Sequence, residues 1–145
     1  MAITTNAICN SFKKELLEAT HNFKSSGGNS FKLALYTSSA TLGKSTTSFT
    51  TDNQVSATGQ YASGGSALTN AGTSLSSDTA LVDFADLSFT GVTLTARGAL
   101  IYNDTASGDP AVCVLNFGSD KTATSGTFTI QFPAFTSSAA VIRIA

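Results

Sequence analysis

The side chains that could carry out chemistry are few in this sequence, and no pattern brings them together. His21 is the one histidine, and neither cysteine lies near it in sequence, so no local set of zinc ligands exists. Serines are numerous, but none stands in the Gly-x-Ser-x-Gly pattern of a hydrolase nucleophile. The pairs Gly27-Gly28 and Gly64-Gly65 lack the spacing of a phosphate-binding loop. We therefore expect no catalytic residue, no cofactor and no metal, and we expect His21 to be a structural surface residue.

Two groups of aspartates could in principle act as acid and base or hold calcium. Asp78, Asp83 and Asp86 form one group, and Asp104 and Asp109 form the other. Neither group has the spacing of a calcium-binding loop. The second group flanks a predicted turn, where aspartate commonly caps its own backbone. We interpret both groups as structural, and we expect that the protein is not an enzyme.

The two cysteines, Cys9 and Cys113, are too few to form a disulfide framework in a chain of 145 residues. We expect free thiols, with Cys113 in the core and Cys9 near the start of a helix. The N-terminus lacks the pattern of a signal peptide, and no apolar run is long enough to span a bilayer. These observations favour folding in a reducing cytosol, with no membrane partner.

Composition indicates one soluble domain over residues 1–145. Only 12% of the residues are charged, about half the usual share, whereas 42 of 145 are Ser or Thr, which favours strands joined by loops. The formal net charge of −1, with basic residues thinly spread, argues against binding nucleic acid through many phosphates. A surface with so little charge fits a role in protein–protein assembly.

The stretch 96–132 predicts the central hairpin of the fold. Its apolar runs, 99–102 and 111–117, are separated by the turn-forming segment 103–110. Neither run alternates with polar residues, so both faces should be covered. We predict turns at 118–121 and 125–126, and further strands at 31–36, 54–57, 66–70, 79–84, 87–89, 92–95, 127–132 and 140–144. The fold class expected is mainly β, an antiparallel β-sandwich that is jelly-roll-like, within residues 31–145.

The region 4–24 predicts the one helix of the chain, which is amphipathic. Its apolar positions recur at spacings of three and four, at Ile8, Phe12, Leu16, Ala19 and Phe23. A residue within 4–6 can supply the N-cap, and Gly27-Gly28 the stop. Phe12, Leu16 and Phe23 must pack on something, which is either the chain's own sheet or a neighbouring subunit.

The segment 37–65 has little predicted structure and is rich in Ser, Thr and Gly. So long a connection is usually functional or mobile, and we predict an interaction arm, with disorder of the whole segment as the alternative. The candidate partner contacts in this arm are Leu42, Phe49 and Tyr61, with Lys44 at the polar rim. Deletion of residues 40–60 is then expected to leave the core folded.

Several short sequence segments, taken in order along the chain, resemble those of a widespread group of small virion structural proteins of tailed bacteriophages. The resemblance covers about residues 30–145 and is carried by 31–42, 58–61, 64–65, 96–103, 115–121 and 130–133. It implies a non-enzymatic virion component that is assembled in the host bacterial cytoplasm. The resemblance indicates kinship and not a location in the particle.

Within such a virion, the resemblance and the low surface charge together favour a capsid cement or decoration protein. It would bind the major capsid protein or other virion proteins, form a homo-oligomer, and have no direct contact with nucleic acid. The alternative is a protein of the neck, tail or fibres that recognises host glycans through exposed aromatic side chains.

Overall fold

The central hairpin is much longer than its two apolar runs. The computed structural model describes residues 3–145, and its longest strands are β6 (Leu87–Asn103) and β7 (Ala111–Ile130), which pair antiparallel. Tyr102 pairs with Ala111 beside the connecting turn, which confirms the predicted hairpin. The strand residues 98–103 and 111–114 are all buried, as expected for a hairpin covered on both faces.

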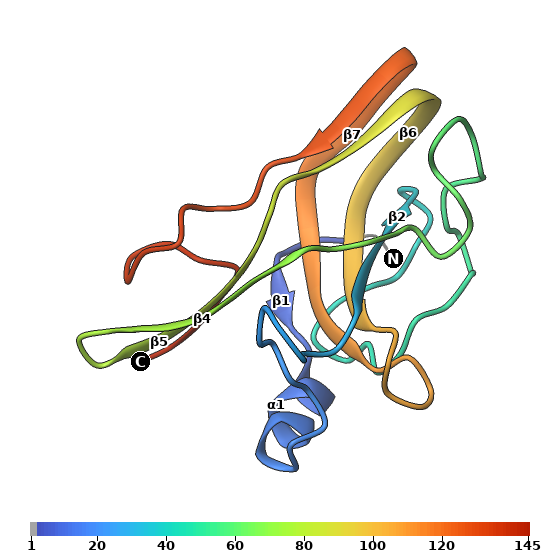
Figure 1. Cartoon of the computed structure of the whole chain (residues 1–145). Coiled ribbons are helices and arrows are strands. Elements are labelled where there is room, and N and C mark those ends of the chain that lie inside the picture. The colour runs from blue at the N-terminus through green and yellow to red at the C-terminus, as the bar shows by residue number, and fades with distance from the viewer. Residues whose placement is uncertain (1–2) are drawn as a thin grey trace.

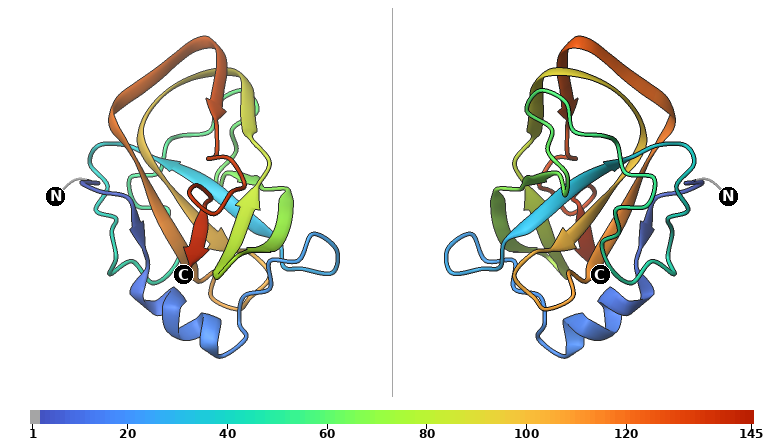
Figure 2. Two further views of the ribbon diagram at one scale, coloured as in Figure 1. Left: turned by 90° about the vertical axis from the view of Figure 1, so that its left-hand side faces the viewer. Right: turned by 90° about the vertical axis from the view of Figure 1, so that its right-hand side faces the viewer.

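The predicted turns at 118–121 and 125–126 are wrong as strand ends, because β7 continues through both. The register passes from Gly98 opposite Asn116 to Ala96 opposite Lys121, so that 117–120 bulges outward. Such bulges bend a strand without ending it. Figure 2 shows the result, since both strands turn back on themselves. The short strands predicted at 87–89 and 92–95 are therefore parts of β6, and the strand predicted at 127–132 is the end of β7, which stops at Ile130.

The strands form two antiparallel sheets (Figure 1). The five-stranded sheet has the order β1-β7-β6-β2-β3, with β1 (Ala7–Ile8), β2 (Phe31–Tyr36) and β3 (Ser66–Ala67). The three-stranded sheet has the order β4-β5-β8, with β4 (Asn70–Ser76), β5 (Thr79–Phe84) and β8 (Ile142–Ile144). One apolar cluster contains buried side chains of both sheets, with Phe84 and Ile142 contributed by the three-stranded sheet.

The bounds of β2 and β5 are those predicted from the sequence, whereas β4 was missed. Its sequence, Asn-Ala-Gly-Thr-Ser-Leu-Ser, is polar, and it becomes a strand because β5 supplies a partner along its length. The strand predicted at 54–57 is only an isolated bridge between Gln54 and Tyr36. The strand predicted at 66–70 ends at Ala67.

The helix α1 spans only Asn10–Leu17, so the predicted range 4–24 is too long at both ends. At the N-terminal side, Ala7 and Ile8 pair with β7 and are therefore extended. The N-cap is Cys9, whose side chain makes no capping hydrogen bond. Pairing with a neighbouring strand has overridden the helical pattern of the sequence.

The segment 37–65 is irregular but packed against the sheets, so it is not a projecting arm. Leu42, Val55 and Tyr61 are buried. The Tyr61 hydroxyl accepts a hydrogen bond from the Leu35 backbone N–H at 2.8 Å. At the end of the segment, Gly65 has φ +80°, and a Cβ there would overlap the Leu33 carbonyl. The segment therefore belongs to the core.

Candidate functional site

The most exposed apolar surface borders a groove between α1 and the three-stranded sheet, which we call the helix–sheet groove. Its volume is about 510 Å³. The helix side contributes Phe12, Leu16 and Ala19, and the sheet side contributes Val82 and Ile142 among others. In Figure 1, α1 lies below the five-stranded sheet while the β4–β5 hairpin extends away from it.

The helix side ends abruptly because α1 closes with a Schellman motif. The Thr20 N–H donates to the Glu15 carbonyl at 3.0 Å, and the Ala19 N–H donates to the Leu16 carbonyl at 3.3 Å. Ala19 occupies the left-handed position with φ 59°, where glycine is usual. The helix therefore ends at Leu17, ten residues before the first glycine of the pair that the sequence offers as a stop.

The sheet side presents aligned rows of apolar side chains. Leu75 lies opposite Ala80, and Ala80 lies opposite Ile144, so these three side chains share one face of the sheet. Leu75 is 72% exposed and Ile144 is 52% exposed. On the helix, Leu17 is 91% exposed. Leu17 lies outside the groove lining, so the exposed apolar side chains at the groove belong to its sheet side. Large apolar side chains left this open beside a groove are typical of an interaction surface.

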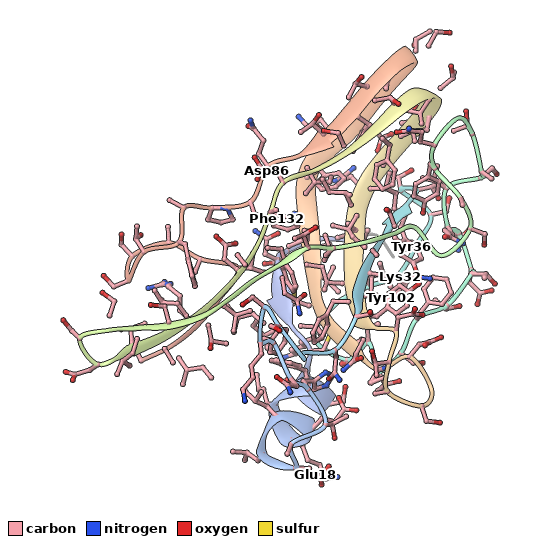
Figure 3. The ribbon with its side chains drawn as sticks, in the orientation of Figure 1. Glu18, Lys32, Tyr36, Asp86, Tyr102 and Phe132 are labelled. Atoms are coloured by element: carbon pink, nitrogen blue, oxygen red, sulfur yellow. The ribbon has the colours of Figure 1, made fainter. Side chains whose placement is uncertain are left out.

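Below the groove, an aromatic column joins the helix to both sheets. Phe23 stacks on Phe31 with ring centroids 4.4 Å apart, and Phe12 meets Phe23 edge-on at 5.9 Å. Phe84 contacts Phe31 at 5.8 Å and Phe132 at 5.9 Å. Figure 3 shows Phe132 close to Asp86, whose carboxylate accepts its backbone N–H at 2.9 Å. The column makes the groove floor a rigid part of the core.

His21 lies in this column, so its expected place on the surface is wrong. Its side chain is fully buried, with the Phe12 ring 4.8 Å away. The Asn103 amide donates to Nδ1 at 3.1 Å, which leaves the proton on Nε2, 3.4 Å from the Glu15 carboxylate. Burial lowers the pKa of His21, although Glu15 acts in the opposite direction. The histidine is therefore a neutral structural residue at neutral pH.

The other reactive side chains are also held in structural roles. Cys9 and Cys113 are free and buried, and burial raises their pKa values to about 11 and about 12. Burial likewise raises the pKa of Asp83, whose carboxylate accepts the Phe84 backbone N–H at 2.9 Å. Asp104 pairs with Lys32 at 3.4 Å.

Residues 3–145 contain no cluster of His, Cys, Asp and Glu side chains that could hold a metal ion. Within the same residues, no helix has the length and apolar character needed to cross a membrane.

The structure brings together only some of the predicted contact residues. Phe12, Leu16 and Phe23 all line the helix–sheet groove, although Phe12 and Phe23 are buried in its floor. The remaining candidates do not join them. Leu42 and Tyr61 are core residues, and Phe49 stacks on Tyr102 with centroids 4.6 Å apart. Lys44 is exposed and lines a different groove.

Sequence reasoning missed Ile144 as an exposed groove residue, and it missed Leu75 and Leu17 as exposed apolar residues outside the groove lining. Leu75 is an isolated leucine in a polar stretch, and Ile144 looks like a core residue of the last strand. Leu17 does carry a signal, because it lies off the apolar face that Phe12 and Leu16 define on the helix.

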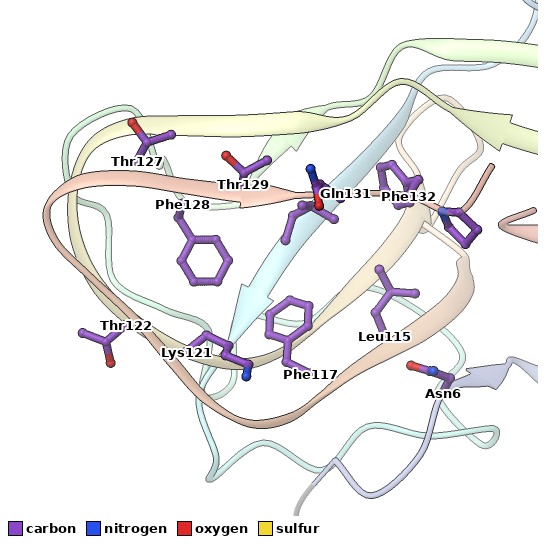
Figure 4. Close-up of a pocket in the computed structure, with 12 residues that line it drawn as sticks. Asn6, Leu115, Phe117, Lys121, Thr122, Thr127, Phe128, Thr129, Gln131 and Phe132 are labelled. Atoms are coloured by element: carbon purple, nitrogen blue, oxygen red, sulfur yellow. The ribbon is translucent and has the colours of Figure 1, made fainter.

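A different groove lies inside the curl of β7, and we call it the ribbon groove (Figure 4). Its volume is about 560 Å³. Phe117 and Phe128 point toward each other across it, with ring centroids 6.0 Å apart. Lys121 and Gln131 add polar groups to the lining. The groove thus combines aromatic faces with hydrogen-bonding side chains.

Comparison with known proteins found no matching family model, no matching curated protein and no matching solved structure. Kinship with phage virion proteins therefore stays a prediction from the sequence.

Proposed function

We propose that this protein is a non-enzymatic structural component of a phage virion, a capsid cement protein that binds the major capsid protein shell. The observation that carries the proposal is the helix–sheet groove, where Ile144 stands exposed beside a rigid aromatic floor and the exposed Leu75 continues the same face of the sheet. Burying such side chains against a partner provides the apolar contact that assembly requires.

The chemistry of the groove supports a protein partner with an apolar ridge. Its lining contains one charged side chain, Lys24, besides the neutral His21. A shell subunit that inserts an apolar side chain between α1 and the sheet would bury Leu75 and Ile144 without desolvating a carboxylate. We include in the proposal the finer architecture, a jelly-roll-like β-sandwich, which two antiparallel sheets sharing one core support.

The first test is the number of copies in purified virions, measured by quantitative mass spectrometry against the major capsid protein. A cement protein should be present at a simple ratio to the shell subunit. A ratio of a few per cent would move the protein to the neck, tail or fibres, and absence from the particle would overturn the virion proposal.

The second test examines the groove with matched variants in one strand. Leu75→Asp places a charge beside the groove, on the sheet face that carries Ala80 and Ile144, whereas Ser74→Asp adds the same charge to the opposite face of β4. A leucine contributes about 1.5–3 kcal/mol when fully buried, so Leu75→Asp should weaken binding to shells about ten- to 140-fold. Equal binding of both variants would exclude the groove as the contact.

One observation favours a second function, recognition of host glycans by a tail or fibre component. The ribbon groove places Phe117 and Phe128 beside the amide of Gln131, a combination suited to the apolar faces and hydroxyls of a sugar. Binding of the purified protein to cell-wall polysaccharide, lost in Phe117→Ala, would support this function. Failure of the wild-type protein to bind would exclude it.

A further inference from the structure

A third groove, which we call the β1 slot, runs along the outer edge of β1 and has a volume of about 940 Å³. One side is formed by residues 4–8 and the other by the loop 41–47, with Lys13 of α1 in the lining. We propose that the β1 slot binds an extended acidic segment of a partner protein, which adds to β1 as a further strand.

The backbone of β1 has a free edge on the side of the slot. β1 is the outermost strand of its sheet and pairs only with β7 among residues 3–145. The Cys9 N–H donates to the Val112 carbonyl at 3.0 Å, so Cys9 and, two residues earlier, Ala7 face β7. Ile8, between them, must direct its N–H and C=O toward the slot. An extended segment placed there could pair with both groups.

The opposite side of the slot is held in place by hydrogen bonds at several points. The Ala111 N–H donates to the Thr47 carbonyl at 3.0 Å, and the Asn10 N–H donates to the Lys44 carbonyl at 2.8 Å. Within the loop, the Gly43 N–H donates to the Thr46 hydroxyl at 3.0 Å. Because the loop is already ordered, an incoming strand would not bear the cost of ordering it.

The charge of the slot favours an acidic segment. Lys13 and Lys44 line it, and no carboxylate does so. Lys13 Nζ lies 3.4 Å from the Asn10 side-chain oxygen, and Lys44 Nζ has no ion pair within residues 3–145. A segment with alternating glutamates would place its carboxylates near these ammonium groups while its backbone pairs with Ile8.

This inference goes beyond the proposed function, because the slot and the helix–sheet groove share no lining residue. A variant in one site can therefore be used as a control for the other. A variant that loses shell binding but keeps peptide binding would be impaired only in the helix–sheet groove. A variant that loses peptide binding but keeps shell binding would be impaired only in the β1 slot.

The experiment measures binding of the full-length protein to short fluorescent peptides by anisotropy. The probe alternates valine and glutamate, and its control carries glutamine in place of glutamate. We expect the glutamate peptide to bind more tightly. Lys44→Gln should weaken its binding about two- to fivefold, and removal of Lys13 as well about tenfold. Lys121→Gln, a surface lysine outside the slot, and Leu75→Asp should leave binding unchanged.

Strand addition itself is tested at the backbone. The Ile8 amide should become protected from hydrogen exchange when the glutamate peptide binds, and N-methylation of alternate peptide amides should abolish that protection. Absence of binding, equal binding of both peptides, insensitivity to the two lysines, or an unprotected Ile8 amide would overturn the proposal. Self-association without peptide that Lys44→Glu abolishes would also overturn it, since the occupant would be a second copy of the chain.

Discussion

Replacement of Ala19 by glycine should make the protein more stable, which is the reverse of the usual effect of adding a glycine. Ala19 stands at the left-handed C′ position of the Schellman motif with φ 59°. That conformation costs a residue with a Cβ about 1–2 kcal/mol relative to glycine. Glycine also has more conformational freedom in the unfolded chain, and this entropy offsets about 0.5–1 kcal/mol of the stabilisation. The net gain in the free energy of unfolding is about 0.5–1 kcal/mol.

Little else should offset this gain, because Ala19 is exposed and buries no methyl group in the core. For a chain of 145 residues, 0.5–1 kcal/mol corresponds to a rise in Tm of about 2–3 °C. Urea unfolding followed by circular dichroism measures the change directly. The matched control is Ala80→Gly, an equally exposed alanine within β5, which should lose about 0.5–1 kcal/mol.

Opposite signs for the two alanine-to-glycine variants would support the assignment of the helix end. A destabilised Ala19→Gly would refute the reasoning, because it would show that the chain does not adopt the left-handed turn after Glu18. The helix side of the groove would then have to be placed differently.

Three further predictions concern His21, the two thiols and the loop. Since burial lowers the pKa of His21, the unfolded chain takes up its proton more readily than the folded one. The free energy of unfolding should therefore fall as the pH drops below about 6.5, and urea midpoints for His21→Gln should show less of this fall between neutral and mildly acidic pH. Cys9 and Cys113, with pKa values of about 11 and about 12, should react with a thiol reagent at pH near 8 only after unfolding; rapid reaction of the native protein would contradict their burial. Deletion of residues 40–60 removes the buried Leu42 and Val55 and should abolish cooperative unfolding. A deletion variant that still folds would show that the segment is an arm outside the core.

Local sequence patterns determined the strands that have a neighbouring strand on both sides, and those whose partner strand comes next in the sequence. The alternation of 31–36 specified β2, because a strand with one face on the core needs apolar residues at every second position. The short apolar segment 79–84, followed by a turn, indicated β5. The unbroken apolar runs that meet near Tyr102 and Ala111 specified a covered hairpin. Composition alone also indicated a mainly β chain.

Tertiary structure decided the elements whose local preference is weak or misleading. β4 is polar and depends on β5, and Ala7 and Ile8 leave the helical pattern because pairing with β7 satisfies their backbone. At the end of α1, an alanine adopts a conformation that favours glycine, so the residue types in the sequence do not predict where the helix ends.

The candidate site belongs to this second group. Leu75 and Ile144 lie far apart in sequence and share a face only because both flank Ala80. Phe12, Leu16 and Phe23 could be recognised as an apolar face, but whether a neighbour or the chain's own sheet covered them was open. A sequence records which side chains are apolar, whereas their exposure depends on which surfaces the folded chain brings against them.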